Sequence, residues 1–496
     1  MAKKTINKEL TGAQDLYNFL FEACNIIRGP VSQDNFKDYI TPLLYYKRIS
    51  DVYDEETEEA LISSGGDKEY ASLPEQHRFV IPDGCHWQEV RERTENLGAA
   101  IVGAMRQIEI ANPDTLYGVL SIFSSQKWTN KAILNDSKIR DLIEHLSRRK
   151  LGNKDYPADL MGDAYEILLK KFADDSKAQA GEFYTPRSVV RLLVHILDPQ
   201  PGETIYDPAC GSGGMLIEAI RYMHDDSLCC GSIFGQEKNV VNAAIAKMNL
   251  FLHGASDFNV MQGDTLRDPK ILQGGNIAKF DCVIANPPFS LENWGATEWS
   301  SDKYKRNIYG TPSDSCGDYA WIQHMICSMV SGQGRMAVVM PQGILFRNQE
   351  TEIRKQLVES DLIEAVVTLG DKLFYGTGLS PCFLIIRRMK PAHHFGRILM
   401  IDGSKILTQK RAQNILEEND IDRLYSLYQN YSDEEDYSRI VTLQEIRDKE
   451  YNLSPNRYVV YHKEEIRPYA EVLAEFKHAY EEVKRLEEEF SLLINA

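Results

Sequence analysis

The chain has no uninterrupted apolar stretch of the roughly 18 residues that are needed to cross a bilayer, so we expect a cytoplasmic protein that does not contact a membrane. Its nine cysteines include no Cys-x-x-Cys pair, which argues against the common zinc and redox sites. We therefore expect reduced thiols and no metal. The composition, with 43% hydrophobic and 26% charged residues and no low-complexity tract, is that of a globular protein.

Positive charge is scarce as well. The chain has 56 Lys and Arg against 73 Asp and Glu, a net charge of -17 at pH 7. A protein that binds a phosphate backbone unaided gains its affinity from Lys and Arg that neutralise phosphates. If a nucleic acid is the substrate, we expect a partner chain to supply much of the basic surface.

A chain of 496 residues is too long for one core, and its patterning predicts three units. Residues 1–155 carry apolar side chains at helical spacing and predict a helical N-terminal domain. Over 156–400, short apolar runs alternate with helical stretches, which predicts a mostly parallel, doubly wound α/β sheet. Over 401–496 we expect no further strands and a helical segment for subunit assembly. Its apolar stripe from Ile466 to Leu493 suits a partner helix or, equally, another surface of the same chain.

A glycine-rich turn follows the first predicted strand of the sheet. Small residues there let the backbone approach a ligand, and the helix that begins after the turn offers free N–H donors. A dinucleotide fingerprint would need glycine where Leu216 stands, which disfavours NAD and FAD. The candidate cofactor-binding residues of this turn are Asp207, Ala209, Gly211, Ser212, Gly213 and Gly214.

Each of the next two predicted strands ends in an acidic residue, Glu237 and Asp264. A carboxylate at the second strand end accepts hydrogen bonds from ribose hydroxyls, and one at the third can accept from an adenine amino group. A single strand-end acid is more often a cap or turn residue. Three acidic strand ends beside a glycine turn favour one bound nucleoside.

A second loop follows the apolar run 280–285 and reads Asn286-Pro287-Pro288-Phe289. With proline near one residue in twenty, Asn-Pro-Pro-aromatic arises by chance in on the order of one chain of this length in several hundred. The alternative to a catalytic loop is a merely rigid loop at a strand end, which the motifs upstream disfavour.

The segment Gly181-Glu182-Phe183-Tyr184-Thr185-Pro186-Arg187, the glycine turn and the Asn286–Phe289 loop, in this order, resemble the modification subunits of type I restriction-modification systems. The resemblance covers about residues 13 to 490. It implies a Rossmann-like, S-adenosylmethionine-dependent methyltransferase domain that modifies N6 of adenine in DNA. It also implies that residues 182–187 and 212–214 hold the methionine part of the cofactor, Glu237 its ribose and, less firmly, Asp264 its adenine ring.

The loop residues suit this chemistry. The lone pair of an exocyclic amino group is delocalised into the ring, and acceptors aimed at its N–H bonds help it to attack a methyl group. We expect the Asn286 side-chain oxygen and the Pro287 carbonyl to be these acceptors, while the two prolines fix the backbone. Phe289 offers a face for a base rotated out of the duplex.

Methylation of a ring carbon would instead need a cysteine nucleophile beside proline. The chain has Pro381-Cys382, but in the wrong order and in an apolar strand. Asp318-Tyr319 and 375–378 are further candidates for the wall of the target-base pocket.

The resemblance also implies partners. We expect double-stranded DNA with the target adenine flipped out, a specificity subunit that reads the sequence, a second copy of the chain and, in some complexes, a restriction subunit. Two other interpretations remain open. A methyltransferase of this fold could act on ribosomal RNA or on a protein glutamine, or the chain could be a non-catalytic assembly subunit.

Overall fold

The computed structural model describes residues 2–116, 118–120, 125–175, 185–223, 232–255, 257–374, 380–410, 413–462 and 469–494. In these ranges, no helix is long and apolar enough to span a membrane. The same ranges contain no cluster of three His, Cys, Asp or Glu side chains that could hold a metal ion.

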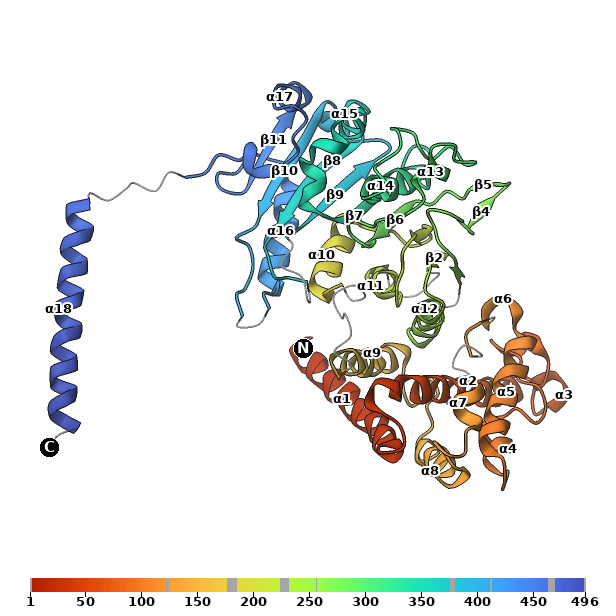
Figure 1. Cartoon of the computed structure of the whole chain (residues 1–496). Helices are drawn as coiled ribbons and strands as arrows, with labels where there is room; N and C mark the ends of the chain where they lie inside the picture. Colours follow the sequence, from red (N-terminus) through yellow and green to blue (C-terminus); the bar gives the residue numbers. More distant parts are fainter. Residues whose placement is uncertain are drawn as a thin grey trace.

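A helical part comes first and lies below the sheet in the view of Figure 1. Leu16, Leu20 and Ile27 recur at helical spacing and are fully buried in its core. Its helices are α1 (Ala2–Ile27), α2 (Phe36–Ser63), α3 (Lys68–Ala71), α4 (Trp87–Arg91), α5 (Leu97–Ala111), α6 (Pro113–Leu116), α7 (Ser125–Thr129), α8 (Asp136–Leu146) and α9 (Ala158–Asp175). The last of these begins after residue 155 yet packs against α1, and the boundary at 155/156 stays a prediction.

The segment 151–156, which precedes α9, is hydrogen-bonded to α2. Asp51 accepts a hydrogen bond from the Leu151 amide at 2.6 Å, and Glu55 accepts from the amides of residues 153 and 154 at 2.6 and 3.0 Å. Arg48, 2% exposed, donates to the Tyr156 carbonyl at 2.9 Å. We call this segment, 151–156, the strap.

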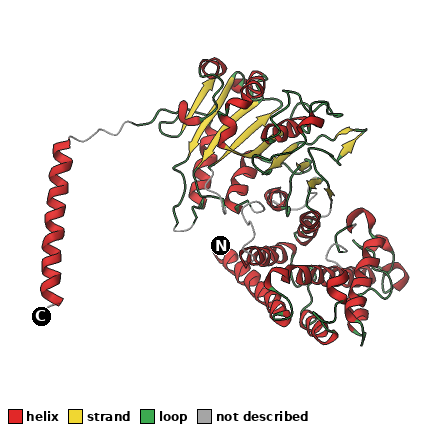
Figure 2. Ribbon diagram, in the orientation of Figure 1, coloured by secondary structure: helices red, strands yellow, loops and turns green. Residues whose placement is uncertain are grey.

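A nine-stranded sheet forms the second part, and Figure 2 shows it with helices on both faces. The spatial order is β11-β10-β8-β9-β7-β6-β1-β2-β3. Only β9 and β11 run antiparallel to their neighbours. The strands are β1 (Ile205–Asp207), β2 (Ile233–Glu237), β3 (Phe258–Gln262), β6 (Cys282–Ala285), β7 (Arg335–Pro341), β8 (Ile363–Leu369), β9 (Pro381–Arg387), β10 (Arg397–Gly403) and β11 (Ser438–Thr442). A small hairpin, β4 (Leu272–Gln273) with β5 (Asn276–Ile277), lies outside this sheet.

The chain reverses its direction of travel across the sheet at β1. From β1 it moves outward to β2 and β3, then returns to place β6 on the other side of β1. The loops after β1 and β6 therefore diverge at the carboxyl edge. In doubly wound sheets, ligands bind in the crevice at such a switch point.

Alternate side chains of the strands enter two cores, one on each face. In β6, Cys282 and Ile284 face one core, while Val283 and Ala285 face the other. The first core is covered by α10 (Arg187–Leu197), α11 (Gly214–Met223), α12 (Val240–Leu252) and α16 (Glu418–Asn430). The second is covered by α13 (Ala296–Trp299), α14 (Asp318–Cys327), α15 (Thr351–Glu359) and α17 (Leu443–Asp448). Side chains of α12 also enter the core of the helical part, so this helix joins the two parts.

The expectation that strands end near residue 400 is wrong. β10 extends to Gly403 parallel to β8, and β11 adds an antiparallel edge strand. β11 reads Ser-Arg-Ile-Val-Thr and is only partly buried, as edge strands often are, so it lacks the apolar run that identified the others. The helix α18 (Tyr469–Ile494) stands apart from the sheet in Figure 1.

Candidate functional site

The glycine turn connects β1 to α11. Gly211 and Gly213 adopt φ of +53° and +85°, a left-handed conformation that favours glycine. Asn249 of α12 donates to the Ser212 carbonyl at 3.0 Å, which fixes the turn against α12. Asn249 was not identified from the sequence, because an Asn inside an apolar helix has many structural roles.

The strand-end carboxylates gather at this turn. Glu237 accepts from the Gly211 amide at 3.0 Å and from the Asn239 amide at 2.7 Å, so it ties the ends of β1 and β2 together. A carboxylate has about four acceptor sites, so Glu237 keeps capacity for a further donor such as a ribose hydroxyl. Asp264 follows β3, and its carboxylate is 2.9 Å from the Lys238 ammonium. The three acids thus lie at the carboxyl ends of adjacent strands, β1, β2 and β3.

Asp207, the last residue of β1, is 2% exposed. Its carboxylate accepts the Ala209 amide at 2.9 Å. Burial raises the pKa of Asp207 to about 8, and the nearby Glu237 adds to the rise. A cation beside this carboxyl, such as the ammonium of an amino acid, would favour the ionised form and lower its pKa.

Asn286 directly follows the fully buried strand β6. Its Nδ2 donates to the Thr185 hydroxyl at 2.8 Å. Its Oδ1 is buried and has no hydrogen-bond partner among the described residues. Buried acceptors are rarely left unpaired in native proteins, so this atom marks a place where a ligand's N–H fits.

The rest of the loop is partly open. Pro287 is buried and Pro288 exposed. The half-buried Phe289 packs near Phe374, with ring centroids 6.4 Å apart and an interplanar angle of 52°. Phe374 was missed in the sequence, although it directly precedes the expected pocket segment 375–378, which lies outside the described residues.

The first motif is described only in part. Glu182, Phe183 and Tyr184 lie outside the described residues, while Thr185 and Pro186 lead into α10. Arg187 begins that helix, and its guanidinium forms an ion pair with Asp163 of α9 at 3.2 Å. Within this motif, Thr185 therefore contacts the Asn286–Phe289 loop, while Arg187 contacts the helical part.

Asp318 and Tyr319 are not on the wall of an open pocket. Both are almost wholly buried, with 0% and 1% exposed. The Tyr319 hydroxyl donates to the Ile344 carbonyl at 2.8 Å, and Asp318 accepts the Ser290 amide at 2.7 Å. Both side chains lie in the core at the start of α14, and so they do not form the wall of an open pocket as we expected.

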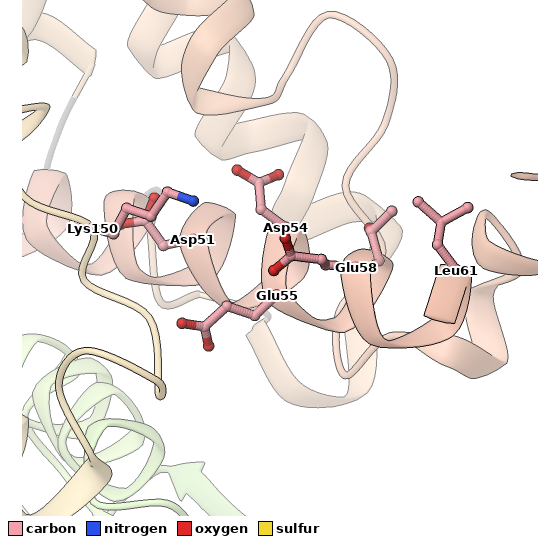
Figure 3. Close-up of a pocket in the computed structure, with 7 residues that line it drawn as sticks. Asp51, Asp54, Glu55, Glu58, Leu61 and Lys150 are labelled. Atoms are coloured by element: carbon pink, nitrogen blue, oxygen red, sulfur yellow. The ribbon is translucent and has the colours of Figure 1, made fainter. Parts of the chain in front are cut away.

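A pocket of about 180 Å³ lies elsewhere, on α2 in the helical part (Figure 3). It is lined by Asp51, Asp54, Glu55, Thr57, Glu58, Leu61 and Lys150. Two of these carboxylates, Asp51 and Glu55, already bind the strap. The pocket contains none of the strand-end residues described above.

Comparison with known proteins assigns the chain to a family. Residues 157–466 match the family model of the N-6 DNA methylases, and residues 16–146 match that of the HsdM N-terminal domain. The chain belongs to the N-6 DNA methylase family. It is 34% identical over 471 residues to the type I restriction enzyme MjaVII methylase subunit of Methanocaldococcus jannaschii, an alignment that covers 90% of this chain and 78% of the relative. It is 31% identical over 360 residues to the HindI methylase subunit of Haemophilus influenzae, covering 70% and 76%.

Solved structures agree with this family. The type I restriction-modification methyltransferase subunit from Streptococcus thermophilus superimposes with a TM-score of 0.76 at 25% identity, covering 91% of this chain and 100% of the other. This N-6 DNA methylase therefore transfers a methyl group from S-adenosylmethionine to N6 of adenine in DNA, as a methylase subunit of the type I restriction-modification kind. The comparisons give no support to ribosomal RNA, protein glutamine or a purely assembling role.

Proposed function

We propose that the Asn286–Phe289 loop is the catalytic loop and that Asn286 Oδ1 and the Pro287 carbonyl accept the two N–H bonds of the target amino group. The unpaired, buried Oδ1 carries this proposal. The Thr185 hydroxyl accepts from the amide nitrogen at 2.8 Å, and the oxygen stays unpaired. An acceptor held in place before the base arrives costs no reorganisation during the reaction.

The residues present fit S-adenosylmethionine. The left-handed glycines let the backbone approach a ligand, and the buried Asp207 suits the ammonium of its methionine part. We assign that part to Asp207, Ala209, residues 182–187 and 211–214, the ribose to Glu237 and the adenine ring to the neighbourhood of Asp264. When bound, the cofactor supplies an electrophilic methyl group. Phe289 stacks on the target adenine once it has left the duplex.

We also propose that sequence recognition lies on a separate specificity subunit, in a complex with a second copy of this chain and, in some assemblies, a restriction subunit. The net charge of -17 disfavours unaided binding of duplex DNA. In the described residues after β11, only short helices and α18 follow, which offers little to read base edges. We also propose a cytoplasmic location, since the substrate is DNA.

Replacement of Asn286 tests the catalytic assignment. For Asn286→Ala in the assembled complex, we expect methyl transfer to plasmid DNA to fall by about 100- to 1000-fold, because one preorganised acceptor is lost. The cofactor Kd should be unchanged. Labelled methyl transfer followed by nucleoside analysis measures the rate and identifies N6-methyladenine.

Asn276→Ala is the matched control, since Asn276 is exposed on the β4–β5 hairpin. We expect this variant to keep the wild-type rate. A wild-type rate for Asn286→Ala would remove the catalytic role from this loop.

A further inference from the structure

The backbone just after the catalytic loop is held in a strained conformation. Ser290 has φ of +49°, in the left-handed region that a residue with a side chain rarely occupies. Its amide donates to Asp318 Oδ1 at 2.7 Å. Because Asp318 is fully buried at the first residue of α14, the acceptor itself cannot move freely. The loop is therefore fixed at its downstream end.

Arg347 supplies the positive charge that pairs with the buried carboxylate of Asp318. Its guanidinium forms an ion pair with Asp318 and a second one with Glu350, at 3.1 Å. Its Nη1 lies 3.4 Å from the Ser290 hydroxyl. A buried carboxylate without a cation is strongly destabilised, so the hold on Ser290 depends on Arg347.

The topology explains why these residues meet. β6 and β7 are adjacent parallel strands, the catalytic loop follows β6, and Arg347 follows β7. The backbone carbonyl of Arg347 is fixed in turn by Arg354, which donates to it at 2.9 Å and is 2% exposed. Through Asp318, Arg347 thus connects the segment that follows β7 to the segment that follows β6.

We propose that Asp318 and Arg347 are positioning residues for methyl transfer, which form a latch that holds the catalytic loop in its reactive geometry. The proposal rests on the assignment of the Asn286–Phe289 loop made above. Neither residue touches the reacting atoms. The latch acts because the position of Ser290 determines where Asn286 and Phe289 stand when the base arrives.

The competing explanation is an ion pair that only stabilises the fold. β7 offers a matched control at its opposite end, where Arg335 pairs with Glu203 at 2.7 Å, with side chains 8% and 20% exposed. This pair lies at the amino end of β7, away from the catalytic loop. Glu203→Gln is therefore expected to lower the thermal midpoint and to leave the rate of methyl transfer unchanged.

Arg347→Met in the assembled complex is the main test, since Arg347 is partly exposed and its loss is better tolerated than that of Asp318. We expect kcat to fall about 10- to 100-fold, because a small displacement of the reacting groups lowers the rate by this order. The cofactor Kd should stay within about twofold of wild type. Arg347→Lys should recover part of the rate, because one ammonium can pair with Asp318 but cannot bridge both carboxylates.

A wild-type kcat for folded Arg347→Met would overturn the latch. So would an equal loss of kcat in Glu203→Gln, because the rate would then follow stability alone. Asn286→Ala, measured in parallel, separates the two proposals. If Asn286→Ala is inactive and Arg347→Met is fully active, only the latch fails. If Asn286→Ala keeps its activity, the loop assignment fails first.

Discussion

The proposed role of Asp207 in holding the methionine ammonium would couple protonation to cofactor binding. An aspartyl carboxyl ordinarily titrates near 3.8, and burial raises the pKa of Asp207 to about 8. Because the folded-state pKa is the higher one, this group's contribution to stability is complete below pH 3.8 and is lost as the pH rises through about 8. Binding of a cationic ammonium favours the ionised form and releases the proton.

We therefore expect the cofactor Kd to decrease by up to about tenfold per pH unit as the pH rises toward 8. Near pH 7, binding should release roughly one proton. Calorimetric titration in two buffers of different ionisation enthalpy measures both. Asp207→Asn should bind weakly at every pH and release no proton, and a Kd that stays flat for the wild type across this range would contradict the assignment.

The helix α18 presents its apolar side chains to solvent. Phe476 is 66% exposed and Phe490 63%, and the same face carries Val472, Tyr480, Val483 and Leu486. None of the described side chains of α18 enters the three hydrophobic cores. A helix with such a stripe gains most of its stability from a partner.

The double variant Phe476→Glu with Phe490→Glu is expected to keep the thermal midpoint and the cofactor Kd, and to weaken association with the specificity subunit by about 100-fold or more, because buried aromatic side chains dominate helical interfaces. Size-exclusion chromatography of the mixed subunits measures this. His478→Glu with Arg485→Gln changes the net charge equally outside the stripe and should still assemble. Normal assembly of the stripe variant would remove this role from α18.

The two parts of the molecule are joined by α12. Phe251 of α12 packs against Tyr45 and Phe79 of the helical part, with ring centroids 5.2 and 4.9 Å apart. The same helix supports the glycine turn through Asn249. Within the helical part, the strap adds a polar connection to α2, whose charged side chains bind its backbone amides.

Gly152 tests the strap. A Cβ at this position would lie 2.0 Å from Glu55 Oε1, so Gly152→Ala must displace that carboxylate from the amides it binds. We expect a loss of about 2 kcal/mol in the free energy of unfolding, measured by thermal or chemical denaturation. Gly103→Ala, with open space around it on α5, should be neutral or slightly stabilising. An unchanged stability of Gly152→Ala would show that the strap contributes little.

Much of the sheet could be predicted from the sequence. Buried parallel strands need continuous apolar runs, and the runs near 205, 233, 260, 283, 337, 366 and 384 all became strands. β10 and β11 were missed for different reasons. β10 straddles residue 400, where we expected the strands to stop, while β11 is a half-polar edge strand that pairs with β10.

The sequence alone determined the family, the order of the three motifs and the kinds of group at the strand ends, because these depend on residue type and on local spacing. Only the tertiary structure decided which atoms meet. Thr185 lies 101 residues before Asn286 and orients its amide, and Arg347 lies 29 residues after Asp318 and pairs with it in the core. Such contacts depend on strand order and on the direction of each side chain, which no local pattern in the chain encodes.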